Sequence, residues 1–340
     1  MNQTKLLKLG VELLKQKKIE EAEIKAKRLL EFVLKQSREE FIRNSLEEVI
    51  EIQEQEYREK LDEIIQGRPL QYITHHQEFM GLDFYVNEDV LIPQPDTEIL
   101  VEEAIKLIQT AQKDNSTNNF GSQNVNESQK EKGQPIQMLD LCTGSGAIAI
   151  SIAKYTEREK EFQTSKNIHL KNSNNLQNEE KQKTQKVSIV ASDISSKALE
   201  IAKQNAIQNQ VEERIQFIQS DMFSKLIDYK FDVIVSNPPY IETNVISTLS
   251  NEVQQEPKIA LDGGKDGLEF YKIILKEASN YLKNNGYVLF EIGYNQGERI
   301  FDLWEQFKCE NKCELKIITK KPIKDLGGND RVMIFQKDTK

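Results

Sequence analysis

Asn237-Pro238-Pro239-Tyr240 is the stretch of the sequence whose residue types are best suited to chemistry. Two consecutive prolines fix φ and remove two backbone N–H donors, which leaves carbonyl groups free to point into a site. The side-chain oxygen of Asn237 and the carbonyl of Pro238 can then accept the two protons of a planar –NH2 group, while the ring of Tyr240 offers a flat surface. We therefore predict that Asn237, Pro238 and Tyr240 align a neutral amide or aromatic amine for attack on an electrophile.

These residues follow an expected strand, Phe231–Ser236, in a region where strands and helices alternate. The other expected strands are Ile136–Leu141, Val187–Ser192, Ile215–Gln219, Tyr287–Ile292, Leu315–Thr319 and Val332–Gln336. The expected helices are Ala147–Lys154, Ser196–Gln208, Asp266–Lys283 and Gly297–Lys308. Such alternation predicts an α/β fold with a parallel sheet covered by helices on both faces. The last two strands are compatible with an antiparallel pair, whose order the sequence leaves open.

Three strand ends carry residues that suit an adenosine-containing cofactor, because ligands of doubly wound sheets bind at the carboxyl ends of the strands. Gly144 and Gly146 form a turn after the first strand that lets backbone approach a ligand. Asp193 ends the second strand and can accept the hydroxyl groups of a ribose. Asp221 and Met222 follow the third, where they can bind an exocyclic adenine amine and pack on its ring. Two plainer interpretations stay open: a simple strand–helix turn at the glycines, and Asp193 as a helix N-cap.

The rest of the chain divides by composition. Apolar residues at helical spacing, with almost no Gly or Pro before Gly67-Arg68-Pro69, predict a small helical domain over residues 1–75. Residues 76–95 are expected to form a β-hairpin linker, and residues 96–340 the catalytic domain, which opens with a helix capped by Asp96 or Thr97. Two polar stretches, 113–134 and 157–186, are predicted to be disordered insertions, since they lack the apolar surface needed to offset ordering entropy.

Charge and composition exclude several classes of protein. The 340 residues include 46 Lys and Arg against 55 Asp and Glu, a net charge of −9, which argues against a general electrostatic grip on nucleic acid. No apolar run reaches the ~18 residues of a membrane span, and no secretory signal is evident. Three cysteines suit a reducing compartment, so we expect a cytoplasmic protein. Cys309 and Cys313 have no second ligand pair, so no metal is expected.

Taken together, the Asn-Pro-Pro-Tyr stretch at a fourth strand end, the glycine turn and Asp193 resemble S-adenosylmethionine-dependent amino-methyltransferases. More narrowly, the chain resembles the HemK/PrmC family, which methylates the glutamine of the Gly-Gly-Gln loop in class-1 peptide-chain release factors. The resemblance covers nearly the whole chain. Its further motifs are Gly67 to Ile73, Val90 to Glu98, Glu256-Pro257 with Ala260-Leu261, Gly263-Gly264, Asp266 to Leu268, Glu291 to Gly293 and Asp330 to Val332.

The resemblance implies a Rossmann-like, seven-stranded S-adenosylmethionine-dependent methyltransferase domain, preceded by a small all-α domain that helps to dock the release factor. It also implies Cys142, Thr143, Gly144, Ser145, Gly146, Asp193, Met222 and Asn237 as cofactor contacts, and Asn237, Pro238, Pro239 and Tyr240 as substrate contacts. The sequence departs from the family pattern at Cys142, where glycine is common, at Gln94, where arginine is usual, and at Met222, where an aromatic residue is often found.

Other functions remain as alternatives. An adenine-N6 nucleic-acid methyltransferase could hold a flipped base in the same way, but it should bring a target-recognition domain and a basic groove. A glutamine methyltransferase acting on a ribosomal protein is a second alternative, although Pro95-Asp96-Thr97-Glu98 is not the sequence expected at this position in such enzymes. A non-enzymatic alternative is a scaffold that binds release factors without turnover.

Overall fold

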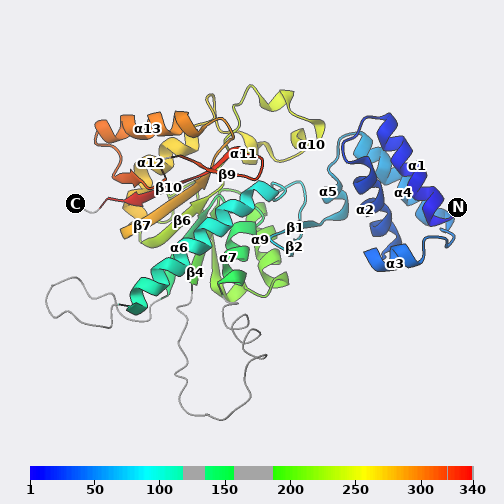
Figure 1. Cartoon of the computed structure of the whole chain (residues 1–340), viewed down its shortest axis with the longest axis horizontal. Coiled ribbons are helices and arrows are strands. Elements are labelled where there is room, and N and C mark those ends of the chain that lie inside the picture. Colours follow the sequence, from blue (N-terminus) through cyan, green and yellow to red (C-terminus); the bar gives the residue numbers. More distant parts are fainter. Residues whose placement is uncertain (118–134, 157–186, 320, 339–340) are drawn as a thin grey trace, which may run out of the picture.

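The computed structural model describes residues 1–117, 135–156, 187–319 and 321–338 (Figure 1). Most of the predicted insertion 113–134, and all of 157–186, lies outside the described residues. Residues 113–117, however, continue helix α6 (Glu98–Thr117), so the predicted insertion begins inside a helix rather than after it.

Five helices form the N-terminal part of the chain. They are α1 (Gln3–Gln16), α2 (Ala22–Leu34), α3 (Arg38–Arg43), α4 (Glu51–Ile65) and α5 (Leu70–Thr74). Their apolar faces share one core, in which Leu6, Leu14 and Leu29 are fully buried. Tyr57 of α4 crosses this core and donates its hydroxyl to the Ala26 carbonyl at 3.0 Å. The predicted helical character of this segment is therefore confirmed, and Figure 1 shows it beside the sheet-containing part.

A short antiparallel hairpin leads away from these helices and occupies only part of the predicted hairpin linker, residues 76–95. Its strands are β1 (Gln77–Phe79) and β2 (Leu82–Phe84). The chain then runs without regular structure to the 3-10 turn Pro95–Thr97, which leads directly into α6. In Figure 1 this stretch connects the N-terminal helices with the sheet-containing part.

The central sheet has the strand order β5-β4-β3-β6-β7-β10-β8. Its strands are β3 (Ile136–Leu141), β4 (Val187–Asp193), β5 (Ile215–Gln219), β6 (Phe231–Ser236), β7 (Leu282–Glu291), β8 (Leu315–Ile317) and β10 (Asp330–Lys337). The first five strands of this order are parallel, while β10 is inserted antiparallel between β7 and β8. The predicted seven-stranded sheet is thus present, and a short strand, β9 (Ile323–Lys324), adds an eighth at β10.

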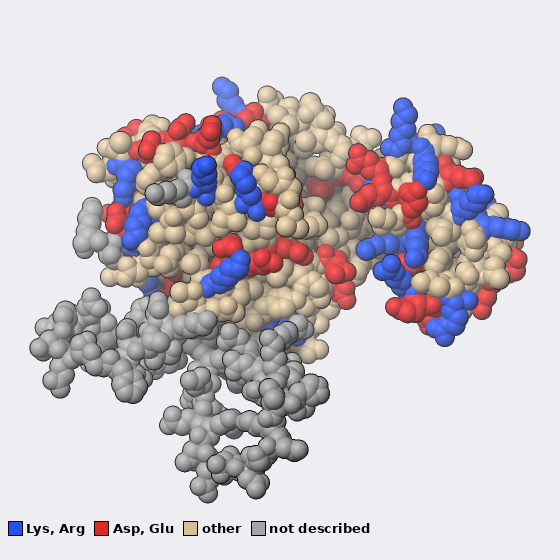
Figure 2. All heavy atoms as spheres, in the orientation of Figure 1, with Lys and Arg blue, Asp and Glu red and all other residues tan. Residues whose placement is uncertain are grey.

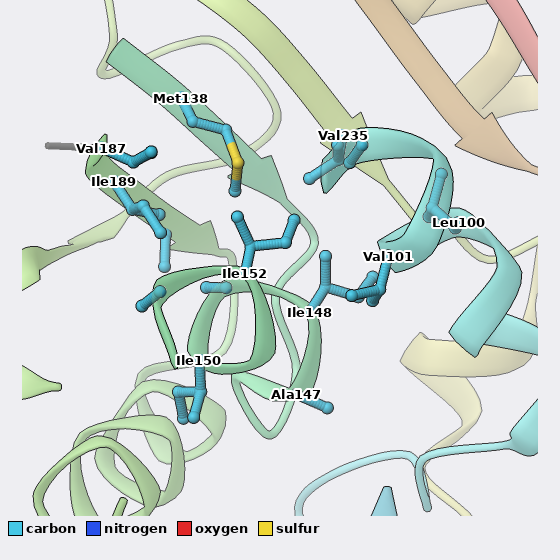
Figure 3. Close-up of a cluster of buried hydrophobic side chains, with 14 of the residues drawn as sticks. Leu100, Val101, Met138, Ala147, Ile148, Ile150, Ile152, Val187, Ile189 and Val235 are labelled. Carbon is cyan, nitrogen blue, oxygen red and sulfur yellow. The ribbon is translucent and has the colours of Figure 1, made fainter. Parts of the chain in front are cut away.

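Helices cover both faces of the sheet because side chains alternate along each strand. Met138, Val233 and Val235 belong to one core with α6 and α7 (Ala147–Tyr155), whereas Ile234 lies in another with α12 (Glu269–Tyr281) and α13 (Gly297–Cys309). Figure 3 shows Ile152 of α7 pointing toward Met138 of β3 and Ile148 lying beside Val101 of α6, whereas Ile150 points away from the strands. Helix α7 is buried on all sides, and this explains its almost wholly apolar sequence.

The remaining elements include one predicted helix and several short elements that were not predicted. They are α9 (Ser196–Gln208), which was predicted, followed by the unpredicted 3-10 turns Glu212–Arg214 and Ile246–Thr248 and the unpredicted helices α10 (Asn251–Gln254) and α11 (Lys258–Leu261). The last three form the connection between β6 and α12, and Figure 1 shows α10 extending toward the N-terminal helices.

Candidate active site

A pocket of about 360 Å³ opens at the carboxyl ends of the parallel strands, a volume in the range of small-molecule sites. It lies where the order of the sheet reverses, between β3 and β6, as expected for a doubly wound sheet. The structure brings together most of the predicted site residues in its wall. They are Cys142, Thr143, Gly144, Ser145, Asp193, Asp221, Met222, Asn237 and Pro239.

The glycine turn after β3 has two different functions. Gly144 and Gly146 both have left-handed φ angles, +53° and +82°, which favour glycine. A Cβ atom on Gly144 would meet no atom within 4 Å, so this side of the turn is open to a ligand. A Cβ atom on Gly146 would lie 3.1 Å from the Cβ of Ala202. Gly146 therefore permits close packing of α7 on α9 and, unlike the other predicted residues of the turn, does not line the pocket.

Asp140, at the end of β3, holds this turn through buried hydrogen bonds, a role that the sequence analysis missed. Its carboxyl group accepts hydrogen bonds from the Thr143 hydroxyl at 2.6 Å and from the Ala149 N–H at 3.2 Å. Burial raises the pKa of Asp140 to about 7, although these two donors oppose the shift. The only available signal was an acidic residue between two leucines in a predicted buried strand.

Asp193 is oriented by two backbone donors at the end of β4. One oxygen accepts from Gly144 N at 2.9 Å and the other from Ser195 N at 2.9 Å. The N-cap of α9 is Ser195, whose hydroxyl accepts from Ala198 N, so the N-cap interpretation of Asp193 is wrong. A carboxylate has about four acceptor positions, and Asp193 therefore keeps capacity for the hydroxyl groups of a ligand in the pocket. Burial raises its pKa against the effect of the N–H donors.

Sulfur atoms form part of the pocket wall. Cys142 Sγ lies 3.9 Å from Met222 Sδ, and both residues have positive φ angles, +64° and +44°. Burial raises the pKa of the Cys142 thiol well above its usual range, which makes it a packing group rather than a nucleophile. Phe270 and Ile273 of α12 also line the pocket. The sequence analysis missed both, because nothing in the α12 sequence marks them out.

The charged groups in the pocket wall all have one sign. Asp89, Asp193, Asp221 and Glu269 line it, and the described lining includes no Lys, Arg or His. This field favours a cationic ligand and disfavours the pyrophosphate of a dinucleotide. The residues present therefore fit S-adenosylmethionine, whose sulfonium and amino group outweigh its single carboxylate and which also carries a ribose and an adenine.

Asn237 lies at the edge of this pocket, directly after β6. Its side-chain nitrogen donates to the Thr97 hydroxyl oxygen at 3.1 Å, which leaves its oxygen available as an acceptor. Pro239 lines the pocket, whereas Pro238 and Tyr240 do not. The Tyr240 hydroxyl instead points to the buried Glu291, 3.4 Å from Oε1. Substrate contacts by Pro238 and Tyr240 therefore remain predictions.

The Asn-Pro-Pro-Tyr turn is held by close packing from the following segment. A Cβ atom on Gly263 would lie 2.7 Å from the Cα of Tyr240, so only glycine fits there without displacing the turn. Gln296 donates a hydrogen bond to the Tyr240 carbonyl at 2.9 Å. Glu291 and Gln296 are both buried polar residues, and their structural roles were not predicted.

Two buried polar side chains attach the segment before α6 to the sheet-containing part. The Asn205 amide donates to the carbonyls of Tyr85 and Ser145 and accepts from Tyr85 N, at 2.7–3.0 Å. Glu256 accepts from Ile92 N at 2.9 Å, and burial raises the pKa of Glu256 to about 7. These contacts bring Thr97 and Gln94 to the pocket. The sequence analysis missed Asn205 and noted Glu256 only through the resemblance.

Other features of the described residues bear on the predicted exclusions. Within these ranges, no group of three or more His, Cys, Asp or Glu is arranged to hold a metal ion. No described helix has the length and apolar character needed to cross a membrane. Cys142, Cys309 and Cys313 are free thiols.

Comparison with known proteins adds independent information. Residues 5–74 match the family model of the PrmC N-terminal domain, and residues 123–248 match that of the RMKL-like methyltransferase domain. The chain is 34% identical over 336 residues to a release factor glutamine methyltransferase of Clostridium botulinum, covering 98% of both chains.

Two further relatives have the same name. The protein of Clostridium acetobutylicum is 34% identical over 309 residues, which cover 90% of this chain and 88% of that one. The protein of Fusobacterium nucleatum is 39% identical over 275 residues, which cover 80% of this chain but 61% of that one. The chain thus spans most of the length of the two clostridial proteins, but less than two thirds of the length of the Fusobacterium protein.

Proposed function

Because the chain belongs to the release factor glutamine methyltransferase family, we propose that it methylates the side-chain nitrogen of the glutamine in the Gly-Gly-Gln motif of class-1 release factors. S-adenosylmethionine is the methyl donor. The observation that carries this proposal is the position of Asn237, whose free amide oxygen lies at the edge of an acidic pocket suited to a sulfonium.

When bound, S-adenosylmethionine supplies an electrophilic methyl carbon. Asp193 and the open backbone at Gly144 would hold its ribose and amino-acid portions, while Met222 would pack against its adenine. The carboxylates of the wall would favour binding of the charged cofactor over its neutral product. We assign no metal to the reaction.

The acceptor glutamine presents a weak, neutral nucleophile, and so alignment matters more than deprotonation. Asn237 and the Pro238 carbonyl would accept its two N–H protons and direct the nitrogen toward the pocket. Holding both reactants in such a geometry can contribute ~7–11 kcal/mol. The same two dipoles oppose the positive charge that develops on nitrogen, an effect of about 3 kcal/mol per group in comparable sites. The glutamine nitrogen, on gaining the methyl group, loses one proton to solvent, and no side chain is assigned as a general base.

The charge distribution supports a protein acceptor over a nucleic acid. On the face shown in Figure 2, acidic and basic side chains are interspersed over the N-terminal helices and the sheet-containing part. The pocket itself carries only acidic groups among the described charged residues, and these would repel a phosphate backbone. The free thiols suit a reducing compartment, and we propose the cytoplasm as the site of the reaction.

The direct test is to incubate the full chain with S-adenosylmethionine and an unmethylated release factor, and to map the product by peptide mass spectrometry. One methyl group on the glutamine of the Gly-Gly-Gln peptide is the expected result. A release factor with that glutamine replaced by alanine is the matched control and should stay unmodified. If the cofactor binds but no glutamine is methylated, the proposal is wrong, and ribosomal-protein and adenine substrates become the next ones to test. Binding without turnover on any of them would indicate a scaffold.

A further inference from the structure

Three segments of the chain meet around Asn237, and hydrogen bonds join them end to end. The Asn237 amide donates to the Thr97 hydroxyl at 3.1 Å, which joins the turn after β6 to the segment before α6. At the other end of that segment, Ile92 N donates to Glu256 Oε2 at 2.9 Å. Glu256 lies directly before α11, so the segment before α6 is joined to α11 as well.

A third contact closes the circuit. Ile241 N donates to the Leu261 carbonyl at 2.9 Å, and this bond joins the residue after the Asn-Pro-Pro-Tyr turn to the last residue of α11. Residues 92–97, 237–241 and 256–261 thus form a closed circuit of chain, which we call the Asn237 ring.

All three segments of the Asn237 ring line the pocket. Their contributions, in chain order, are Gln94 and Thr97, Asn237 and Pro239, and Ile259 and Ala260. Asp193 and the glycine turn, which are suited to hold the cofactor, belong to none of these segments. The ring therefore bounds the part of the pocket in which an acceptor amide would meet Asn237.

Ile259 of α11 is the large apolar side chain of this ring that is most open to solvent. It is 56% exposed although it lines the pocket, and its side chain takes part in none of the bonds that close the ring. A glutamine has only two methylene groups between its main chain and its amide. The main chain of an acceptor must therefore come close to the ring when its amide reaches Asn237.

We propose that Ile259 is a specificity-determining residue, which contacts the acceptor main chain beside the glutamine and leaves room there only for a residue without a side chain. This inference rests on the proposed function and gives a physical reason for a Gly-Gly-Gln acceptor. Glycine has no Cβ atom, so its main chain can lie against an isoleucine that a larger residue would displace. One added methyl group in a closely fitting apolar site changes kcat/KM about 10- to 200-fold.

The test compares two acceptor proteins: a release factor with its Gly-Gly-Gln motif, and the same release factor with the second glycine replaced by alanine. We expect kcat/KM of the wild type to be about 10- to 200-fold higher for the first acceptor. Ile259→Ala should reduce this ratio about 10-fold or more, because it removes more volume than the added methyl group occupies. Ile259→Val should give an intermediate ratio.

The ratio also separates specificity from stability. A variant that is only less stable would lower kcat/KM for both acceptors and leave their ratio unchanged. Ile207→Ala, on α9, is the matched control, since Ile207 is 62% exposed and does not line the pocket. Its ratio should equal that of the wild type.

A second measurement requires no turnover. The Kd of each acceptor, measured by fluorescence anisotropy with the demethylated cofactor bound, should show the same loss of discrimination in Ile259→Ala. Equal ratios in the wild type, Ile259→Val and Ile259→Ala would overturn the inference, while methylation of the Gly-Gly-Gln glutamine would still support the proposed function. If the wild type binds the release factor but modifies no glutamine, the proposed function is wrong, and the two Kd values decide whether Ile259 selects the acceptor. If it binds neither acceptor, both proposals are wrong.

Discussion

Glu291→Gln should make the protein more stable at alkaline pH. Burial raises the pKa of Glu291 from 4.5 to about 7, and the Thr97 hydroxyl and Arg331 only partly oppose this effect. A raised pKa means that the folded state favours the protonated, neutral carboxyl group. The stability contributed by this group is complete below pH 4.5 and is lost as the pH rises to about 7.

The size of the effect follows from the difference in pKa. A difference of about 2.5 corresponds to about 3 kcal/mol, at ~1.4 kcal/mol for each pKa unit. Because Glu291 is 2% exposed, solvent screening requires little correction. Glutamine has the same shape and does not titrate, so Glu291→Gln should match the wild type near pH 4.5. At pH 8 the variant should exceed the wild type by about 3 kcal/mol.

Urea denaturation followed by Trp304 fluorescence is a suitable assay. Trp304 is the single tryptophan in the chain and donates to the Leu315 carbonyl, so it reports on the same sheet-containing part as Glu291. Asp140 and Glu256 also have a pKa raised to about 7, but they titrate equally in both proteins. Exposed Glu305→Gln is the control. The reasoning is refuted if the difference between Glu291→Gln and wild type is the same at pH 5 and pH 8.

Three further substitutions test other parts of the argument. Asn237→Ala should lower kcat by about 10²–10³, as for loss of one pre-oriented polar group, with little change in the denaturation midpoint. A methylation assay would measure the loss of kcat, and calorimetry would measure cofactor binding by the same variant. Asp193→Ala should weaken S-adenosylmethionine binding at least ~10-fold, since about 1.4 kcal/mol corresponds to a factor of ten; unchanged affinity in calorimetry would contradict its ribose role. Gly10→Ala should destabilise the N-terminal helices by about 1–3 kcal/mol, because its Cβ would lie 2.0 Å from the Tyr57 hydroxyl; circular dichroism during thermal unfolding should show this while cofactor affinity persists.

The central strands were predictable because their burial produces unmistakable sequences. The bounds of β3 and β6 are as predicted, and most residues of each are buried. The bounds of β5 are also as predicted, although β5 is an edge strand in which only Ile215 is buried. Strand β7 begins at Leu282, five residues before its predicted start. Lys283, Asn284 and Asn285 have the composition of a loop, but pairing of Leu282 with Phe231 extends the strand over part of this region. Tertiary pairing here overrides local propensity.

The strand-end residues of the site were predictable for a similar reason. The topology of a doubly wound sheet places them together whatever lies between them in sequence, and Asp193 reaches Gly144 across 49 residues. No comparable topological rule places the buried polar residues Asn205 and Glu256. Asn205 contacts Tyr85 across 120 residues and Glu256 contacts Ile92 across 164, and neither residue differs locally from an ordinary surface side chain.

The segment between the hairpin and α6 contacts both the buried polar supports and a strand-end residue of the site. Its backbone is anchored by Asn205 and Glu256, and its last residue, Thr97, contacts Asn237. The connection between β6 and α12 approaches the N-terminal helices, where Lys25 of α2 pairs with Glu252 of α10. The N-terminal helices and the Asn-Pro-Pro-Tyr turn are thus joined by two routes.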